Sequence, residues 1–267
     1  MRADLYLYSK GYCRSRTEAK RLIENGWVLL DGVPIKKPGY NIESGENEED
    51  RIKIVERSRF VSRGGEKLDF ALSYFSVDVK DKIALDAGAS TGGFTDCLLQ
   101  NGAAFVYSVD CGHDQLSPVL KNNPKVKSCE GVNIRYLTRD DIPAACDICV
   151  CDLSFISQTL CYDSILSVIS DNAVFITLYK PQFEVGRKYI GKNGIVHDRD
   201  AVFSTATDII EYGISRCLEC RGFISSPILG GDGNLEYLIY YQRNNSVKDT
   251  GISEKIYNQI KSEIYRI

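Results

Sequence analysis

The sequence predicts an α/β fold in which a small, separate α+β unit precedes a mostly parallel, doubly wound sheet. From residue 80 onward, short apolar runs alternate with helix-like segments, and a glycine-rich turn follows the first apolar run. Continuous apolar strands separated by helices indicate a parallel sheet that is covered on both faces. A stretch rich in Pro, Gly, Ser and charge, residues 36–50, separates this larger domain from the N-terminal unit.

The composition is that of a globular protein. Of the 267 residues, 43% are hydrophobic and 26% are charged, which supplies a core and shows no sign of disorder. The net charge of −3 argues against a uniformly basic surface but leaves room for a local basic patch. The charged N-terminus lacks the apolar core of a signal peptide, and no uncharged run approaches the roughly 18 residues that cross a bilayer. We therefore expect a cytoplasmic protein.

Ten cysteines in such a chain indicate reduced thiols rather than a disulfide framework. Two C-x-x-C pairs, Cys146/Cys149 and Cys217/Cys220, leave zinc as an alternative. The first pair lies in the run "CDICVCD", which is typical of a buried strand where cysteine serves as a small apolar residue. Only two histidines are present, so a histidine-rich metal site is excluded. We predict no metal and no obligate protein partner.

The N-terminal unit contains a predicted helix and a predicted hairpin. In "SRTEAKRLIENG", Ser15 is the expected N-cap, Glu18 its capping-box partner and Gly26 the end of the helix. The run "WVLLDGVPI" predicts a hairpin that turns at Asp31-Gly32.

This unit is also locally basic, because residues 10–37 hold seven basic and three acidic side chains. Spacing alone leaves a solvated helix and a phosphate-binding patch as alternatives. The segment "RADLYLYSKGYCRSRTEAKRLIENGWVLLDGVPIKKPG" resembles the S-four RNA-binding module, although the usual opening Arg-Leu-Asp stands here as Arg2-Ala3-Asp4. The resemblance implies RNA binding. The candidate RNA-binding residues are Arg2, Lys10, Arg14, Arg16, Lys20, Arg21, Lys36, Lys37 and Arg63.

The larger domain is predicted from its alternating elements. The expected strands are residues 82–88, 104–110, 147–154, 173–180 and 235–242, and the expected helices are residues 92–102, 157–170 and 199–222. We divide the chain into an N-terminal domain with its linker (1–58), a larger α/β domain (59–246) and a helical tail (247–267).

The glycine-rich turn "LDAGASTGGFTD" indicates a nucleoside cofactor. It lacks the Walker lysine, and its glycine spacing departs from the dinucleotide pattern. Asp86 would repel a phosphate but could accept a hydrogen bond from an ammonium group, while Asp110 ends the next strand and could bind both ribose hydroxyls. These features predict S-adenosylmethionine, against the alternative of a tight turn with an exposed aspartate. The candidate cofactor residues are Asp86, Gly88, Ser90, Gly92, Gly93, Phe94, Asp110, Asn133 and Asp152.

Two later strands end on charged residues, Asp152 in "VCDLSFIS" and Lys180 in "FITLYKPQFEVG". In open α/β sheets the ligands lie beyond the carboxyl ends of the strands, so we expect this pair at the site. The alternative is an ion pair with a purely structural role.

Several stretches, among them "FVSRGGEKL", "LYKPQFEVGRK", "GKNGIVHD" and "SPILGGDGNLEYL", resemble the TlyA family, sometimes called hemolysins. This resemblance covers nearly the whole chain and implies a Rossmann-like class I methyltransferase domain of the FtsJ type behind the S-four module. It also implies S-adenosylmethionine-dependent 2′-O-methylation of ribosomal RNA, with a cytidine ribose as the expected target. The family's catalytic tetrad falls on Lys67, Asp152, Lys180 and Glu236.

Two other functions remain as alternatives: a non-catalytic RNA-binding or assembly factor, and a membrane-active hemolysin. Within the tetrad, the protonation of Lys180 is open. Burial and a nearby Lys67 would lower the pKa of Lys180 and make it a base, whereas Asp152 and Glu236 would keep it protonated as a hydrogen-bond donor.

Overall fold

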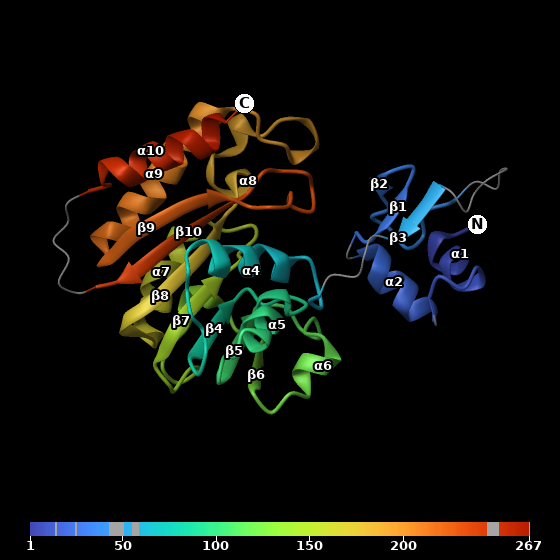
Figure 1. The fold of residues 1–267 in the computed structure, drawn as a ribbon, viewed down its shortest axis with the longest axis horizontal. Helices are drawn as coiled ribbons and strands as arrows, with labels where there is room; N and C mark the ends of the chain where they lie inside the picture. The colour runs from blue at the N-terminus through green and yellow to red at the C-terminus, as the bar shows by residue number, and fades with distance from the viewer. Residues whose placement is uncertain (14, 25, 43–50, 55–58, 245–250, 267) are drawn as a thin grey trace. The chain divides into compact units, whose positions relative to one another are not determined.

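The computed structural model describes residues 1–13, 15–24, 26–42, 51–54, 59–244 and 251–266. The chain divides into two compact units, Met1–Arg63 and Gly64–Ile267, which are described separately below (Figure 1).

The first unit packs two helices against a small antiparallel sheet with the strand order β2-β1-β3. Its elements are α1 (Ala3–Ser9), α2 (Arg16–Glu24), β1 (Val28–Leu30), β2 (Val33–Pro34) and β3 (Ile52–Ile54). The expected cap is confirmed, since the backbone N–H of Glu18 donates to Ser15 Oγ at 3.1 Å. The expected hairpin is also confirmed, with positive φ at Asp31 and Gly32. No strand was predicted at residues 52–54, which the sequence assigned to the linker, and the pairing of β3 with β1 places them in the sheet of this unit.

The second unit is built on a seven-stranded sheet with the order β6-β5-β4-β7-β8-β10-β9. The first five strands of that order run parallel, whereas β10 is antiparallel to both of its neighbours, so the mostly parallel sheet is confirmed. The strands are β4 (Ile83–Ala87), β5 (Phe105–Asp110), β6 (Val126–Glu130), β7 (Cys146–Cys151), β8 (Ile169–Tyr179), β9 (Leu218–Ser225) and β10 (Tyr237–Arg243).

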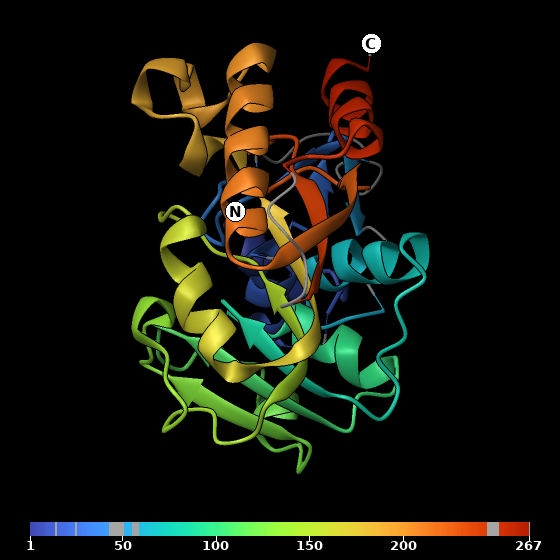
Figure 2. The ribbon, with the colours of Figure 1, turned by 90° about the vertical axis from the view of Figure 1, so that its left-hand side faces the viewer.

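Helices cover both faces of this sheet. Figure 2 shows α4 and α5 on one side and α7 and α9 on the other, which is the doubly wound arrangement. The longer helices are α4 (Gly64–Tyr74), α5 (Gly93–Gln100), α7 (Thr159–Val168), α9 (Arg199–Ser215) and α10 (Glu254–Tyr265). The short ones are α6 (Pro118–Lys121), α8 (Pro181–Glu184), η1 (Ile134–Tyr136), η2 (Arg187–Tyr189) and η3 (Lys192–Gly194).

One predicted helix was too long. The sequence predicts a helix over residues 199–222, but α9 ends at Ser215, and Leu218–Ser225 forms the edge strand β9. Cys217 adopts a positive φ between the two elements, which ends the helix. The apolar spacing of the strand continued that of the helix, so periodicity alone did not separate them.

The predicted C-terminal helix is present as α10. Its residues Ile256, Ile260 and Ile264 recur every four positions and are buried in the main core, where the helix packs against β9 and α9. In the Rossmann-like unit as a whole, the carboxyl ends of β4, β5, β7 and β8 meet at one edge of the sheet. That edge positions the candidate site.

Candidate active site

Four charged residues that are distant in the sequence meet at this edge as two lysine–carboxylate pairs. Lys67 lies in the first turn of α4, and Glu236 immediately precedes β10. The Lys67 Nζ and Glu236 Oε2 atoms are 2.5 Å apart, and their side chains are only 10% and 3% exposed. Such a buried pair is costly to break, because either partner alone would leave an unpaired charge.

The second pair joins neighbouring parallel strands. Asp152 follows β7, and Lys180 follows β8, where it precedes Pro181 at the start of α8. Lys180 Nζ lies 2.5 Å from Asp152 Oδ1. It also donates a hydrogen bond to Ser154 Oγ at 3.0 Å. Because proline is favourable at the first helical position, the chain leaves β8 after Tyr179 and turns into α8 at Lys180 without loss of a helix hydrogen bond.

The electrostatics of Lys180 are set by two opposing effects. Burial lowers the pKa of Lys180, but Asp152, through its charge and a hydrogen bond, and the charge of Glu236 raise it, and the net direction is upward. Glu236 therefore acts on Lys180 as well as on its own partner, Lys67, so the two pairs form one cluster. In the protein without substrate, Lys180 is an ammonium group.

Glycines allow the backbone to lie close to Asp152 and to Glu236. A Cβ at Gly88, where φ is +88°, would lie 2.4 Å from the backbone oxygen of Asp152. A Cβ at Gly230 would lie 2.3 Å from Glu236 Oε1. A larger residue at Gly230 would displace the Glu236 carboxylate, and one at Gly88 would displace the backbone of Asp152.

The predicted cofactor turn connects β4 to α5, and Asp86 lies buried beneath it. Asp86 Oδ2 accepts a hydrogen bond from Thr95 Oγ1 at 2.6 Å. Its Oδ1 is also buried and has no hydrogen-bond partner within the part of the chain that is described. Burial raises the pKa of Asp86 to about 7, although the Thr95 hydrogen bond opposes the shift.

Asp110 joins the cofactor turn to the loop that follows β5. Its carboxylate accepts hydrogen bonds from the backbone N–H groups of Ser90, at 2.8 Å, and Gly112, at 2.7 Å. The backbone N–H of Val132 donates to the Asp110 carbonyl at 3.1 Å, which brings the loop containing Asn133 to the same place. Asn133 is exposed and caps η1 by accepting from the Arg135 N–H.

The remaining glycines permit close packing under the turn. A Cβ at Gly92, where φ is +94°, would lie 2.3 Å from Leu120 Cδ1. Gly93 and Phe94 begin α5 and are buried.

The donor set fits S-adenosylmethionine. The buried, unpartnered Asp86 Oδ1 can accept from the ammonium of an amino acid, and the Asp110 carboxylate retains acceptor capacity for ribose hydroxyls. The α5 helix also directs its N-terminal N–H groups toward the turn, which favours the ligand's carboxylate.

Sequence reasoning missed several residues beside the ion pair of Lys180 and Asp152. Phe155 adopts a positive φ of 66° and is 91% exposed, and its ring lies 4.9 Å from the ring of Phe183. Lys180 Nζ lies 5.9 Å from the centre of the Phe183 ring. The only signal in the sequence was the wording "DLSFIS", which does not tell which side chain points outward.

A buried polar network around Gln158 connects the loop after β7 to β8 and α8. Gln158, 3% exposed, accepts from the hydroxyls of Tyr162 and Thr177 at 3.0 and 2.7 Å. Its backbone N–H donates to Glu184 Oε1 at 2.9 Å. The loop that carries Asp152 is thereby fastened to β8 and α8, between which Lys180 lies.

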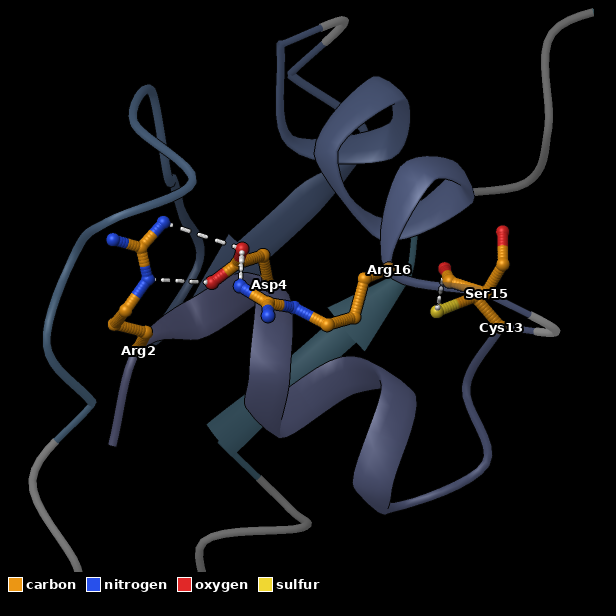
Figure 3. A network of polar contacts seen from close by, with 5 residues as sticks. All are labelled: Arg2, Asp4, Cys13, Ser15 and Arg16. Carbon is orange, nitrogen blue, oxygen red and sulfur yellow. Dashed lines mark hydrogen bonds and ion pairs between the residues drawn. The ribbon is translucent and has the colours of Figure 1, made fainter.

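In the N-terminal unit, Asp4 organises two of the predicted RNA-binding arginines (Figure 3). Its buried carboxylate accepts from Arg2 Nε at 3.0 Å and from Arg16 Nη2 at 2.8 Å. Both arginine side chains remain about half exposed, at 52% and 49%. The Arg2 and Arg16 guanidinium groups hold the pKa of Asp4 well below its usual range.

The nine predicted RNA-binding residues lie in different places. Four of them line one cavity of the first unit, namely Lys20, Lys36, Lys37 and Arg2, which also contacts Asp4. Lys10 lies over the ring of Tyr6 at 5.8 Å, and Arg63 lies against Gly26. Arg14 and the side chain of Arg21 lie outside the described residues.

The cysteines of the first C-x-x-C pair are packed as apolar residues, whereas Cys217 and Cys220 are partly exposed. Cys146 and Cys149 are fully buried in β7, and burial raises the pKa of both thiols. Across the described ranges, no three His, Cys, Asp or Glu side chains gather in an arrangement that could hold a metal ion.

The fold and the site define a class of protein: a Rossmann-like methyltransferase domain with a lysine–carboxylate cluster, preceded by a small basic module. Residues 60–243 match the FtsJ-like methyltransferase family, and residues 1–47 match the S4 domain. The chain belongs to the FtsJ-like methyltransferases, and within them to the TlyA family, whose methyl donor is S-adenosylmethionine.

Individual relatives agree with this assignment over nearly the whole length. The chain is 37% identical to the 16S/23S rRNA (cytidine-2'-O)-methyltransferase TlyA of Mycobacterium tuberculosis, with 97% of each protein covered. It is 39% identical to Hemolysin A of Brachyspira hyodysenteriae, with 90% of this chain and 99% of the relative covered. A solved structure from Streptococcus thermophilus superposes with a TM-score of 0.76 at 35% identity, covering 98% of this chain and 95% of that one.

The hemolysin name raises the question of membrane insertion. Across the described parts of the chain, none of the helices combines the length and the apolar character needed to cross a bilayer.

Proposed function

We propose that this protein transfers the methyl group of S-adenosylmethionine to a ribose 2′-hydroxyl of ribosomal RNA, with cytidine as the expected nucleoside. One observation carries the proposal. Lys180, Asp152, Lys67 and Glu236 form a single charged cluster at the sheet edge, beside the turn that fits the methyl donor. The relative from Mycobacterium tuberculosis is named as an rRNA cytidine 2′-O-methyltransferase, which supports this choice of substrate.

The chemistry requires orientation more than a strong base. S-adenosylmethionine, when bound, supplies a methyl group that its sulfonium has already activated. A ribose hydroxyl is a poor nucleophile, so the protein must hold its oxygen in line with that methyl group. Lys180 can do this as an ammonium that donates a hydrogen bond to O2′, because its pKa is raised in this cluster.

The proton of the hydroxyl then needs an acceptor. As the oxygen–methyl bond forms, the sulfur–methyl bond of the donor would break and the donor would leave as a neutral thioether. The oxygen becomes positively charged and strongly acidic, so a weak base suffices to take its proton. Asp152 is a carboxylate that lies 2.5 Å from Lys180 Nζ and is 22% exposed, so it can accept that proton and pass it to water. In this role Lys180 orients the nucleophile and Asp152 receives the proton.

The second pair has a positioning role in the proposal. Two lysines and two carboxylates make the cluster neutral, which reduces the cost of burying them together. Lys67 fixes Glu236, and Glu236 in turn favours the protonated state of Lys180.

An exposed aromatic side chain supports an RNA substrate. Unpaired bases commonly stack on aromatic rings, and enzymes that modify a nucleotide extrude it from its helix. We propose that Phe155, which is 91% exposed beside Lys180, takes such a base.

The predicted division of the chain is part of the same proposal. Residues 1–58 would bind RNA, residues 59–246 would carry the chemistry, and residues 247–267 would form a supporting helical tail. A ribosomal RNA substrate would place this activity in the cytoplasm.

The test is transfer of tritiated methyl groups from S-adenosylmethionine to purified ribosomal subunits and to naked rRNA, followed by mapping of 2′-O-methylated positions. We expect incorporation at a cytidine, its loss in Lys180→Ala, and normal incorporation in the exposed control Lys80→Ala. Absence of incorporation into either substrate by the wild-type protein would overturn the proposal.

A further inference from the structure

The first unit contains a cavity that the methyltransferase chemistry does not use. It has a volume of about 770 Å³ and lies between α2, the β1–β2 hairpin and the turn at residues 36–40. Binding sites for small molecules typically measure about 300–1,000 Å³, so the cavity has room for one nucleotide.

The walls of this cavity combine two kinds of surface. Its apolar part includes Val33, which is 67% exposed, Tyr40, which is 47% exposed, and the hairpin proline Pro34. Among the described residues that line it, the charged part consists of four cations and one carboxylate, Glu24; the cations are Arg2, Lys20, Lys36 and Lys37. Within the described lining, positive charges therefore outnumber negative ones by three beside an aromatic and aliphatic hollow.

The cavity is held open by backbone hydrogen bonds. The N–H groups of Ala3 and Asp4 donate to the carbonyls of Tyr40, at 2.7 Å, and Pro38, at 3.1 Å. The Arg2 side chain is held by the Asp4 carboxylate and lies against Gly39, where a Cβ would be 3.7 Å from its Nη1. A preformed site pays less ordering entropy on binding than one that must assemble.

We propose that this cavity binds a single unpaired nucleotide of the RNA substrate. The base would lie against Tyr40 and the apolar side chains of the hairpin, and its phosphates would contact Lys36, Lys37 and Arg2. This inference rests on the proposed function only in taking RNA as the ligand.

The composition of the walls favours an unpaired nucleotide over a continuous double helix. A duplex presents phosphates and riboses, which basic side chains on an open surface can contact without any hollow. Exposed Val33 and Tyr40 gain nothing from a phosphodiester, but an unstacked base offers them an apolar face. A ligand that carries both a flat base and a phosphate matches both kinds of wall.

The test measures binding of the full-length protein, without S-adenosylmethionine, to two fluorescent RNA hairpins. One hairpin carries a single bulged uridine in its stem, and the other carries an abasic residue at the same place, so that their phosphates are identical. We expect the bulged hairpin to bind about tenfold more tightly, in line with the measured effect of removing one stacking partner.

Variants assign the effect to the cavity. Tyr40→Ala should abolish the difference between the two hairpins, whereas Tyr8→Ala should preserve it, because Tyr8 is equally exposed at 48% but lies on α1 away from the cavity. Lys37→Ala should weaken the binding of both hairpins alike and reduce the slope of log affinity against log salt concentration by about one. Lys53→Ala, an exposed lysine on β3 outside the cavity, serves as its control.

Three results would overturn the inference: equal affinity for the bulged and the abasic hairpin, preserved discrimination in Tyr40→Ala, or no binding of either hairpin at low salt. None of these results would change the outcome expected in the methyl-transfer assay. Failure of the cavity proposal is therefore distinguishable from failure of the proposed enzymatic function.

Discussion

The two units use ion pairs in opposite ways. In the first unit, the buried carboxylate of Asp4 holds two arginines whose side chains stay about half exposed. At the sheet edge of the second unit, the lysines themselves are nearly buried, at 10% and 12% exposure. Arginine has a permanent charge and several donors, whereas lysine has a compact charge that shifts with its surroundings. The first arrangement suits recognition of phosphates, and the second suits chemistry on one atom.

The largest expected effect comes from removing Lys180, the proposed hydrogen-bond donor to the ribose hydroxyl. Lys180→Ala should reduce the rate of methyl transfer by about 10²–10⁴-fold, because the hydroxyl loses the donor that holds it in line. Calorimetry should show nearly unchanged binding of S-adenosylmethionine. Lys180→Arg would sharpen the comparison, since a planar guanidinium keeps the charge but not the geometry, and we expect it to remain inactive. Wild-type turnover in Lys180→Ala would remove Lys180 from the mechanism, whereas wild-type turnover in Lys180→Arg would show that any cationic donor at this position suffices.

The next effect concerns the buried pair of Lys67 and Glu236. Lys67→Met alone should lower the free energy of unfolding by roughly 3–5 kcal/mol, because Glu236 is left buried without its cation. The double variant Lys67→Met/Glu236→Leu should regain most of that stability in urea unfolding while methyl transfer stays impaired. Recovery of activity along with stability would show that the pair serves only the fold.

A smaller effect is expected from the ion pairs of Asp4 with Arg2 and Arg16. Asp4→Asn should weaken binding to rRNA by about tenfold, because the charge-assisted hydrogen bonds that orient Arg2 and Arg16 are weakened. The maximal rate at saturating RNA should not change. Asp232→Asn, an exposed substitution in the second unit, is the control. A fall in the maximal rate would contradict the division between recognition and chemistry.

The smallest effect tests a buried carboxylate that lacks a cation. With a pKa of about 7, Asp86 is mostly protonated at pH 6 and mostly ionised near pH 8. If its carboxylate binds the ligand's ammonium, affinity for S-adenosylmethionine should rise several-fold between about pH 6 and pH 7.5. Isothermal titration calorimetry of wild-type and Asp86→Asn would measure this. A wild-type affinity that is flat across this range would rule out the assigned role.

Sequence reasoning identified what depends on local patterns. The strands at Ile83–Ala87 and Cys146–Cys151 follow from apolar runs, and the cap at Ser15 follows from its spacing to Glu18. The edge strand Leu218–Ser225 was not predicted, because its apolar spacing continued that of the preceding helix. The tetrad was assigned through family resemblance, since no local pattern links Lys67 to Glu236 across 169 positions.

Features that arise from packing were not predictable in this way. The outward direction of Phe155 depends on a positive φ in its loop, which the residues "SFI" do not require. The joint contact of Arg2 and Arg16 with Asp4 depends on how α1 packs against α2. Pairwise contacts of this kind exist only once the chain has folded.

The close approach at Gly88 has a practical meaning for engineering. Because a single added carbon would lie 2.4 Å from the Asp152 carbonyl, the glycine-rich turn after β4 and the loop after β7 cannot be changed independently of each other. A glycine-rich turn grafted from another methyltransferase would have to bring its own segment after β7 with it. The two loops would have to be exchanged together, although 63 residues of chain lie between Gly88 and Asp152.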